Sequence, residues 1–219
     1  MATLVVRQEF AQQQDYARTW TAMRALTDTR DANTMDELWW LQHPGVFTQG
    51  QAGKAEHVLA AGDIPVVRTD RGGQVTYHGP GQLVGYLLFD LRRLDIGVRA
   101  MVMAIEGAII DLLQDHGVIA VARRDAPGVY VDGRKVAALG LRVRRGCTYH
   151  GLSLNVDNDL APVARINPCG YEGLAVTRCK DLGIDADVAS LATQLTSHLV
   201  DRFGYDAVSY PATMYNASC

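Results

Sequence analysis

One cysteine of this chain has the surroundings that a nucleophile would need. Cys169 lies between Pro168 and Gly170 in residues 166–171, a composition that predicts a sharp turn instead of a packed element. A turn leaves backbone N–H groups unpaired, and such groups can lower a thiol pKa or hold an oxyanion. Free cysteines are more often buried and inert, so a structural Cys169 is the competing interpretation.

A nucleophilic thiol also needs a base or a cation close by. The candidates are Lys135, His78 and His150, and their spacing alone does not choose among them. Lys135 opens a predicted strand of small and apolar residues, so it is either a solvated strand-end charge or a lysine directed into a pocket. Ala138 and Gly140 in that strand are small enough to leave room for a ligand or a neighbouring chain segment.

Residues 71–81 form a glycine- and proline-rich segment, RGGQVTYHGPG. Such a backbone can come close to a ligand, and this segment also carries Arg71, Tyr77 and His78. It lacks the Gly-Lys-Ser/Thr ending of a P-loop, so it does not predict a phosphate site. The alternative is a long structural turn between two strands.

The remaining cysteines give weaker indications. Cys147 and His150 have a Cys-x-x-His spacing that Cys169 and Cys179 would have to complete for a zinc site, but no second tight ligand pair exists. We therefore expect no metal. The four cysteines are too scattered for a disulfide framework and favour a reducing cytoplasm.

Hydrophobic periodicity predicts three helices, over residues 15–31, 99–116 and 187–203, with Gly117 and Gly204 at the ends of the last two. Strands are predicted over residues 37–41, 65–68 and 82–91, the last buried on both faces. Residues 128–131 and 135–143 flank Asp132-Gly133, a hairpin signal, and residues 148–156 add a third strand. This order predicts an α+β fold with a mixed, mostly antiparallel sheet and packed helices.

Composition limits the class of protein. The chain has 219 residues, 48% of them hydrophobic, and a net charge of −3, which predicts one globular domain over residues 1–219 and no nucleic-acid partner. No long apolar run predicts a membrane span, and the N-terminus does not read as a secretory signal. Residues 123–145 carry seven basic residues and two acidic ones, which is either a patch for an acidic protein partner or a solvated hairpin tip.

Three stretches together resemble the lipoyl(octanoyl) transferase family of lipoate biosynthesis. They are RGGQVTYHGPGQLVGY at residues 71–86, GRKVAALGLRVRRGCTYHGLSLNV at residues 133–156 and RINPCGY at residues 165–171. They cover nearly fifty residues in the family's order and spacing. The resemblance implies the α+β architecture shared with biotin and lipoate protein ligases.

The same resemblance implies an activity and the residues that carry it. The activity is transfer of octanoyl from octanoyl-acyl carrier protein to a specific lysine of apo lipoyl domains, in 2-oxoacid dehydrogenases and the glycine cleavage H protein, without nucleotide or metal cofactor. Cys169 matches the nucleophile that forms the acyl thioester, and Lys135 matches the lysine that activates the thiol and the incoming amine. The implied acyl-pocket positions are Arg71, Gly72, Gly73, Gln74, Val75, Thr76, Tyr77, His78, Ala138, Leu139, Gly140, His150, Gly151, Leu152 and Ser153.

Several points stay open on the sequence. Ser153 stands where many relatives have alanine, and Ala138 where serine is common, so pocket size is expected to survive. Whether His78 and His150 transfer protons or only hold the loops is undecided, as are acyl-chain length and oligomeric state. The competing functions are an ATP-dependent lipoate or biotin ligase, a thioesterase, and a non-catalytic acyl-binding module.

Overall fold

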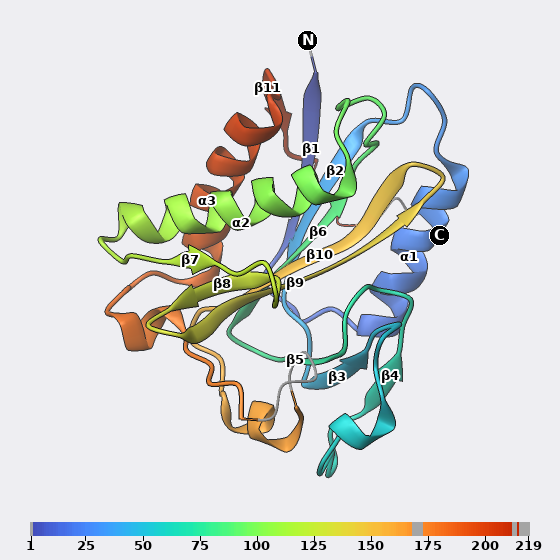
Figure 1. Ribbon diagram of the computed structural model, residues 1–219. Coiled ribbons are helices and arrows are strands. Elements are labelled where there is room, and N and C mark those ends of the chain that lie inside the picture. The colour runs from blue at the N-terminus through green and yellow to red at the C-terminus, as the bar shows by residue number, and fades with distance from the viewer. Residues whose placement is uncertain (1, 168–172, 212–213, 215–219) are drawn as a thin grey trace.

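A mixed sheet forms the centre of the molecule (Figure 1). The structure, a computed structural model, describes residues 2–167, 173–211 and 214. Within this part of the chain the sheet has eight strands. In spatial order they are β11 (Ala207–Ser209), β1 (Thr3–Glu9), β2 (Asp36–Leu41), β6 (Gln82–Leu88), β10 (Cys147–Asn155), β9 (Arg134–Arg144), β8 (Gly128–Val131) and β7 (Val121–Ala122).

Strand direction divides this sheet into two parts. β1 runs parallel to both of its neighbours, β11 and β2. From β2 through β6, β10, β9 and β8 to β7 every pair is antiparallel. The predicted α+β class with a mixed, mostly antiparallel sheet is therefore confirmed. The parallel pairing places β1, the first described strand of the chain, beside β11, the last, at one edge of the sheet.

A smaller sheet lies at one end of the large one and carries the glycine-rich segment (Figure 1). Its strands are β4 (Val66–Arg68), β3 (Val46–Gln49) and β5 (Val75–His78), with β3 parallel to β4 and antiparallel to β5. The short helical turns η1 (Ala55–His57) and η2 (Ala161–Arg165) lie near it, and η4 (Cys179–Leu182) precedes the last helix. The middle of the glycine-rich segment is thus a strand, which composition alone did not indicate.

Three helices among the described residues cover the large sheet. They are α1 (Tyr16–Thr29), α2 (Val98–Asp115) and α3 (Val188–Phe203). α2 and α3 pack together on one face, where the largest apolar cluster lies. α1 packs on the other face through Ala22 and Met23, which join a cluster that includes Trp39 and Tyr149. Both faces of the central strands are therefore buried. No described helix is both long and apolar enough to cross a bilayer.

The helix ends follow the capping signals of the sequence. The Asp15 side chain accepts a hydrogen bond from the Arg18 backbone N–H, and the Asp187 side chain does the same for Ser190, so each caps the first turn of its helix. α3 ends at Gly204, which adopts a left-handed conformation (φ 71°) and donates to the Val200 carbonyl. The three predicted helices are confirmed within one or two residues at each end.

The predicted strands are confirmed with one difference in length. β6 is buried along its whole length, as expected for a strand covered on both faces, but it ends at Leu88. The ladder stops there because the Asp90 N–H bonds to the Asp36 carboxylate and a turn begins. At the predicted hairpin, Asp132 and Gly133 both have positive φ (48° and 77°), the conformation that an Asp-Gly turn favours.

Candidate functional site

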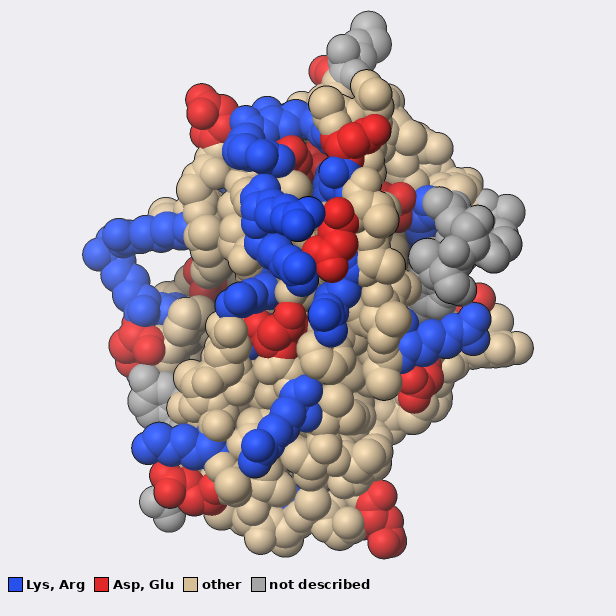
Figure 2. Space-filling view, turned by 90° about the vertical axis from the view of Figure 1, so that its right-hand side faces the viewer, with Lys and Arg blue, Asp and Glu red and all other residues tan. Residues whose placement is uncertain are grey.

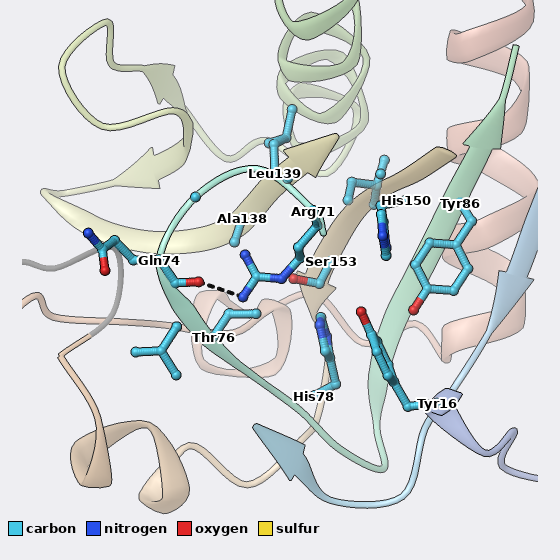
Figure 3. Close-up of a pocket in the computed structure, with 15 residues that line it drawn as sticks. Tyr16, Arg71, Gln74, Thr76, His78, Tyr86, Ala138, Leu139, His150 and Ser153 are labelled. Carbon is cyan, nitrogen blue, oxygen red and sulfur yellow. Dashed lines mark hydrogen bonds between the residues drawn. The ribbon is translucent and has the colours of Figure 1, made fainter. Parts of the chain in front are cut away.

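A pocket opens where β5 and the residues before it cross β9 and β10 (Figure 3). Its lining comes from the glycine-rich segment, from the middle of β9 and β10, and from single residues of α1 and β6. The lining residues are Tyr16, Arg71, Gly73, Gln74, Val75, Thr76, His78, Tyr86, Ala138, Leu139, Gly140, His150, Gly151, Leu152 and Ser153. The structure thus brings together every pocket position expected from the sequence except Gly72 and Tyr77.

Gly72 and Tyr77 do not line the pocket, although both belong to the segment that forms one of its walls. The Gly72 N–H donates to the Leu141 carbonyl at 2.9 Å, which ties the glycine-rich segment to β9. Tyr77 alternates with its neighbours along β5, so its ring faces away from the pocket and packs on Phe47 in a separate apolar cluster. Sequence resemblance marks both positions, but the structure places neither of them in the lining of the cavity.

The guanidinium of Arg71 holds the glycine-rich segment in shape. Its Nε donates to the Thr48 hydroxyl at 2.9 Å, and its terminal nitrogens donate to the carbonyls of Gly72 (2.9 Å) and Gln74 (2.7 Å) (Figure 3). The side chain is buried, so these charge-assisted bonds lie in a low-dielectric setting that strengthens them. Arg71 therefore fixes the curved backbone that forms one wall of the pocket.

The small residues of β9 make room both for a neighbouring chain segment and for the pocket. A Cβ on Gly140 would meet the Gly72 carbonyl oxygen at 3.0 Å, so this glycine makes room for the chain segment that crosses it. Ala138 and Leu139 instead line the pocket. On β10, a Cβ on Gly151 would meet the Gly85 carbonyl oxygen at 2.1 Å, which only glycine avoids. Along this strand the structure shows a cavity beside Ala138 and Leu139 and a neighbouring segment against Gly140.

One end of the pocket, which we call the closed end, is made of buried rings: Tyr16, His78, Tyr86 and His150. The opposite end includes the exposed Gly73 and the partly exposed Thr76. The sequence did not indicate Tyr16 and Tyr86. Tyr16 lies in the helix predicted over residues 15–31 and Tyr86 in the strand predicted over residues 82–91, and nothing in either segment marks one position as facing a cavity.

The histidines at and behind the closed end are held neutral by burial. Burial lowers the pKa of His78 to about 3 and that of His43 to about 4, because the charged imidazolium loses its hydration. His43 Nδ1 bonds to the Gln14 carbonyl, so His43 Nε2 accepts from the Tyr86 hydroxyl at 2.7 Å. Neutral rings with fixed tautomers favour a holding role for His78, one of the two roles that the sequence left open.

His150 pairs with an aspartate that the sequence did not single out. Its Nε2 lies 3.0 Å from Asp70 Oδ1, and the same carboxylate accepts from Trp20 Nε1 at 2.9 Å and from the Tyr149 hydroxyl. Burial raises the Asp70 pKa, but these hydrogen bonds outweigh it and hold that pKa well below its usual range. Burial lowers the pKa of His150 itself. The pair is therefore a carboxylate and a neutral imidazole.

A chain of hydrogen bonds leads from the pocket to the strand that carries Lys135. His78 Nδ1 donates to Gln82 Oε1 at 2.8 Å, and Gln82 Nε2 donates to Asn155 Oδ1 at 2.9 Å. Asn155 Nδ2 in turn donates to the Thr177 carbonyl at 3.0 Å, and the Thr177 N–H donates to the Lys135 carbonyl at 2.9 Å. This network is buried and couples the position of His78 to the backbone at Lys135.

Lys135 is a buried lysine, which excludes one of the two interpretations of its position in the sequence. Its side chain is enclosed, with the residue only 3% exposed, so it is not a solvated strand-end charge. The ammonium donates to the Pro127 carbonyl at 3.2 Å and lies 5.3 Å from the centroid of the Tyr130 ring. Lys135 does not line the pocket described above, but it opens the strand that does.

The structure adds an acidic residue beside this lysine. Glu106, on α2, accepts a hydrogen bond from the Gly128 N–H at 2.8 Å, and Gly128 lies against the Lys135 side chain. Burial raises the pKa of Glu106, while the Gly128 N–H and the Lys135 charge act in the opposite direction. Sequence analysis missed Glu106 because it lies within an apolar helix face and far from the motifs in the chain.

Cys169 lies outside the residues that the structure describes, as do Pro168 and Gly170. The described residues that follow them contact Lys135 directly: the Lys135 N–H donates to the Ala175 carbonyl at 2.9 Å. Cys147 and Cys179 are free and buried, and burial raises the pKa of the Cys179 thiol to about 12. Among described residues no cluster of three His, Cys, Asp or Glu side chains has metal-site geometry.

The basic residues between positions 123 and 145 do not form one patch. Arg134 begins β9 and Arg144 ends it, so the two groups of arginines lie at opposite ends of an eleven-residue strand. Figure 2 shows basic side chains gathered over α1 and the β9–β10 turn, with acidic side chains between them. Arg144 there pairs with Asp28 at 3.1 Å, while Arg145 is exposed. The charge is concentrated on this face by the fold, from segments distant in sequence.

Comparison with known proteins identifies the family. The family model described as "Lipoyl protein ligase A/B catalytic domain" matches residues 15–200. The chain belongs to this family. It is 62% identical over 191 residues to an octanoyltransferase of Stutzerimonas stutzeri, covering 87% of each chain. It is also 58% identical over 208 residues to an octanoyltransferase of Marinobacter nauticus, covering 95% of this chain and 97% of the relative. These relatives are acyltransferases, and so is this enzyme.

Solved structures of lipoate and biotin protein ligases have the same fold at low sequence identity. A putative lipoate protein ligase from T. acidophilum with bound lipoic acid superposes with a TM-score of 0.76 at 15% identity, over 97% of this chain and 90% of that one. The biotin protein ligase of Aquifex aeolicus superposes with a TM-score of 0.51 at 9% identity, over 93% of this chain and 69% of that one. The predicted ligase-like architecture is confirmed.

Proposed function

We propose that this enzyme transfers an octanoyl group from octanoyl-acyl carrier protein to a specific lysine of apo lipoyl domains, through a thioester on Cys169. The observation that carries the proposal is the pocket, whose walls come from the motifs shared with octanoyltransferases and which opens along the strand that begins at the buried Lys135. The shared name of the relatives supports the octanoyl group as the cargo.

The first half-reaction loads the enzyme. The Cys169 thiolate attacks the carbonyl carbon of the donor thioester, the new carbon–sulfur bond forms, and the carrier thiolate leaves and takes up a proton from the Lys135 ammonium, which leaves Lys135 neutral. One thioester replaces another, so the step needs no nucleotide to drive it. A thiolate is the reactive form of cysteine, and a nearby cation stabilises it. We assign that role to the Lys135 ammonium, whose backbone neighbours Ala175 and Thr177 follow Cys169 closely in the chain.

The second half-reaction delivers the acyl group. The acceptor amine must be neutral to attack, and with a pKa of about 10.4 only on the order of one in a thousand lysines is neutral at pH 7. Once the thioester has formed, the negative charge on Cys169 is gone and Lys135 becomes a better base. Lys135 then takes the proton as the amine bonds to the acyl carbon, and the Cys169 thiolate leaves.

The partners of the reaction are proteins. The acceptors we propose are the lipoyl domains of 2-oxoacid dehydrogenases and the glycine cleavage H protein. The basic face over α1 and the β9–β10 turn would attract an acidic carrier protein by charge (Figure 2). We also propose that residues 1–219 act as one catalytic domain in the cytoplasm, where free thiols such as Cys147 stay reduced.

An ATP-dependent ligase is the second candidate, because solved structures with this fold include a lipoate-protein ligase A bound with ATP. A ligase activates a free acid as an adenylate and needs no cysteine adduct. A thioesterase would pass the acyl group to water, and a binding module would hold it without reaction. Each alternative predicts a different product from the same mixture, so one experiment separates them.

The test is to incubate the enzyme with octanoyl-acyl carrier protein without ATP and to take an intact mass. We expect a gain of one octanoyl group, its absence in Cys169→Ala, and its discharge onto an added apo lipoyl domain. Cys147→Ala is the matched control, and it should keep the adduct. Turnover only with ATP and free acid would establish the ligase, and release of free octanoate without protein modification would establish a thioesterase.

A further inference from the structure

The closed end of the pocket contains a buried polar atom with no hydrogen bond. His150 Nδ1 is inaccessible to solvent and has no partner among the residues that the structure describes. The residue is 1% exposed and lines the pocket, and its ring points into the space between Arg71 and Tyr86 (Figure 3). Leaving such an atom unpaired costs free energy, so it indicates a polar partner in the pocket.

The surroundings of His150 decide which kind of partner fits. Asp70 is a carboxylate, which can only accept, so His150 Nε2 carries the ring proton and donates it at 3.0 Å. Trp20 and Tyr149 donate to the same carboxylate and hold it in place. A neutral imidazole has one N–H, so Nδ1 presents a lone pair. The partner must therefore be a hydrogen-bond donor.

The neighbouring polar groups do not supply that donor. The Tyr86 hydroxyl donates to His43 Nε2. The Arg71 guanidinium donates to Thr48, Gly72 and Gln74. The Tyr16 hydroxyl at the same end is itself buried without a hydrogen bond, and burial raises its pKa to about 12. The closed end thus offers a lone pair and a hydroxyl to whatever fills it.

We infer that the closed end is a hydrogen-bonding subsite, in which His150 Nδ1 accepts a hydrogen bond from an O–H or S–H group on the far carbons of the acyl chain. This inference rests on the proposed function, in which the pocket holds the acyl chain of the substrate. The exposed end at Gly73 and Thr76 is where the chain enters, so the carbons most distant from the thioester reach the rings. An unsubstituted chain places a methyl group against the lone pair.

The subsite predicts a preference opposite to that of a plain apolar slot. An apolar pocket favours a methyl over a hydroxyl of the same size, because burying an unpaired hydroxyl is costly. A pocket with an unpaired hydrogen-bond acceptor favours the hydroxyl over the methyl, because the hydroxyl donates to the acceptor and the methyl leaves it unpaired. The ω-hydroxyoctanoyl and nonanoyl groups form the matched pair, because they differ only by O–H against CH₃ at the end of the chain.

The first test compares acyl carrier protein thioesters of octanoate, ω-hydroxyoctanoate and nonanoate by kcat/KM for transfer to an apo lipoyl domain. We expect the hydroxylated chain to exceed nonanoyl by about tenfold, the usual worth of one such hydrogen bond. In His150→Phe, which keeps a ring and removes the acceptor, the order should reverse. A wild-type preference for nonanoyl would overturn the subsite while octanoyl turnover left the proposed function intact.

A second histidine–aspartate pair, outside the pocket lining, provides a control variant. His198 on α3 bonds through Nε2 to Asp115 Oδ2 at 2.8 Å, away from the pocket, so His198→Asn should leave the wild-type preference unchanged. Loss of the preference in that variant would mean that it does not come from His150. Because each comparison is made between two substrates of one variant, a general loss of activity does not affect it.

A second measurement needs no variant and no turnover, which matters because His150 has a positive φ of 60° and Phe tolerates this poorly. Nitrogen-15 spectra of the wild-type enzyme report the unprotonated Nδ1 of His150 directly. We expect its resonance to move upfield when free ω-hydroxyoctanoate is added and to stay in place with nonanoate. Equal shifts with both acids, or none with either at saturation, would overturn the subsite.

Discussion

Two regions of this enzyme bury titratable side chains, and they differ in the charge of those side chains. At the closed end of the pocket, burial lowers the pKa values of His43, His78 and His150, so the rings are neutral and hydrogen-bonded through one tautomer. At the start of β9, Lys135 is equally buried but lies beside Glu106, the Pro127 carbonyl and an aromatic ring. Neutral groups need partners of the right hydrogen-bonding type, whereas a charge also needs an opposite charge.

The difference indicates which region does chemistry. The neutral rings of the closed end suit binding, because they can hold an acyl chain without forming or breaking an ion pair when the chain leaves. A buried ammonium with an adjacent carboxylate can change its charge when its neighbour changes, which proton transfer requires. Variants of the two regions should therefore differ in whether they change the rate of the reaction or only the stability of the fold.

Removing the charge at Lys135 should have the largest effect on the reaction. In Lys135→Ala we expect both acylation of Cys169 and transfer to the acceptor to slow by about 10²–10⁴-fold at neutral pH, the usual range for a lost acid–base group. Rapid-quench mass spectrometry separates the two steps. Arg134→Ala, the exposed neighbour, should keep both rates. Unchanged rates in Lys135→Ala would remove this lysine from the mechanism.

Gly128 should be the most sensitive structural position of the Lys135 region. Its φ is 139°, and a Cβ there would meet the Ala137 carbonyl oxygen at 2.6 Å and the Lys135 side chain at 3.1 Å. We expect Gly128→Ala to lower the free energy of unfolding by about 1–3 kcal/mol through overpacking. Gly133→Ala is the control, since Gly133 has positive φ but open space around it. Equal losses in urea unfolding would show that crowding does not matter.

The closed end should make the fold sensitive to acid. His78 and His43 have folded-state pKa values of about 3 and about 4 against an ordinary value of 6.5, so the unfolded chain binds their protons more readily. Stability is therefore full above pH 6.5 and is lost as the pH falls toward 4, by up to about 1.4 kcal/mol per pH unit for each histidine. Urea unfolding should give a smaller slope in His78→Gln and the wild-type slope for exposed His116→Gln.

Glu106 should change the pH dependence of stability in the opposite direction to the histidines, and by a smaller amount. Its folded-state pKa is raised above the ordinary value of 4.5, so the folded protein binds this proton more readily, and stability falls as the pH rises from 4.5 through the folded value. Glu106→Gln keeps an acceptor for the Gly128 N–H and should remove that decline, which is at most about 1.4 kcal/mol per pH unit. The exposed Glu56→Gln should keep it. A decline of the same size in Glu106→Gln would assign it elsewhere.

Local signals in the sequence predicted the elements that rest on local physics. α1 and α3 begin at capping aspartates, α2 and α3 end at or just before a glycine, and the Asp132-Gly133 turn has the positive φ values that its residue types favour. β1 and β11 escaped prediction because each is an edge or parallel strand whose pairing partner is distant in sequence. Nothing within Thr3–Glu9 indicates that it pairs with β2 and β11.

The residues of the candidate site also fall into two groups, those that sequence motifs predicted and those that they did not. The motifs supplied the residues of the glycine-rich segment and of β9 and β10, because each motif is contiguous and has a backbone shape of its own. Tyr16, Tyr86, Asp70 and Glu106 were missed, since each lies in a segment whose pattern is explained by its helix, strand or loop. Their roles depend on a partner from another element: Glu106 on Gly128, and Asp70 on His150.

Periodicity, capping, turn chemistry and contiguous motifs were enough to predict the fold class, the three helices, the main hairpin and the family resemblance from the amino-acid sequence. Contacts between distant segments establish that Lys135 is buried near Glu106 and that Tyr77 faces away from the pocket. They also establish that His150 Nδ1 is buried without a partner at the closed end. Burial and hydrogen-bond pairing belong to the assembled molecule, because they depend on which distant segments the sheet brings into contact.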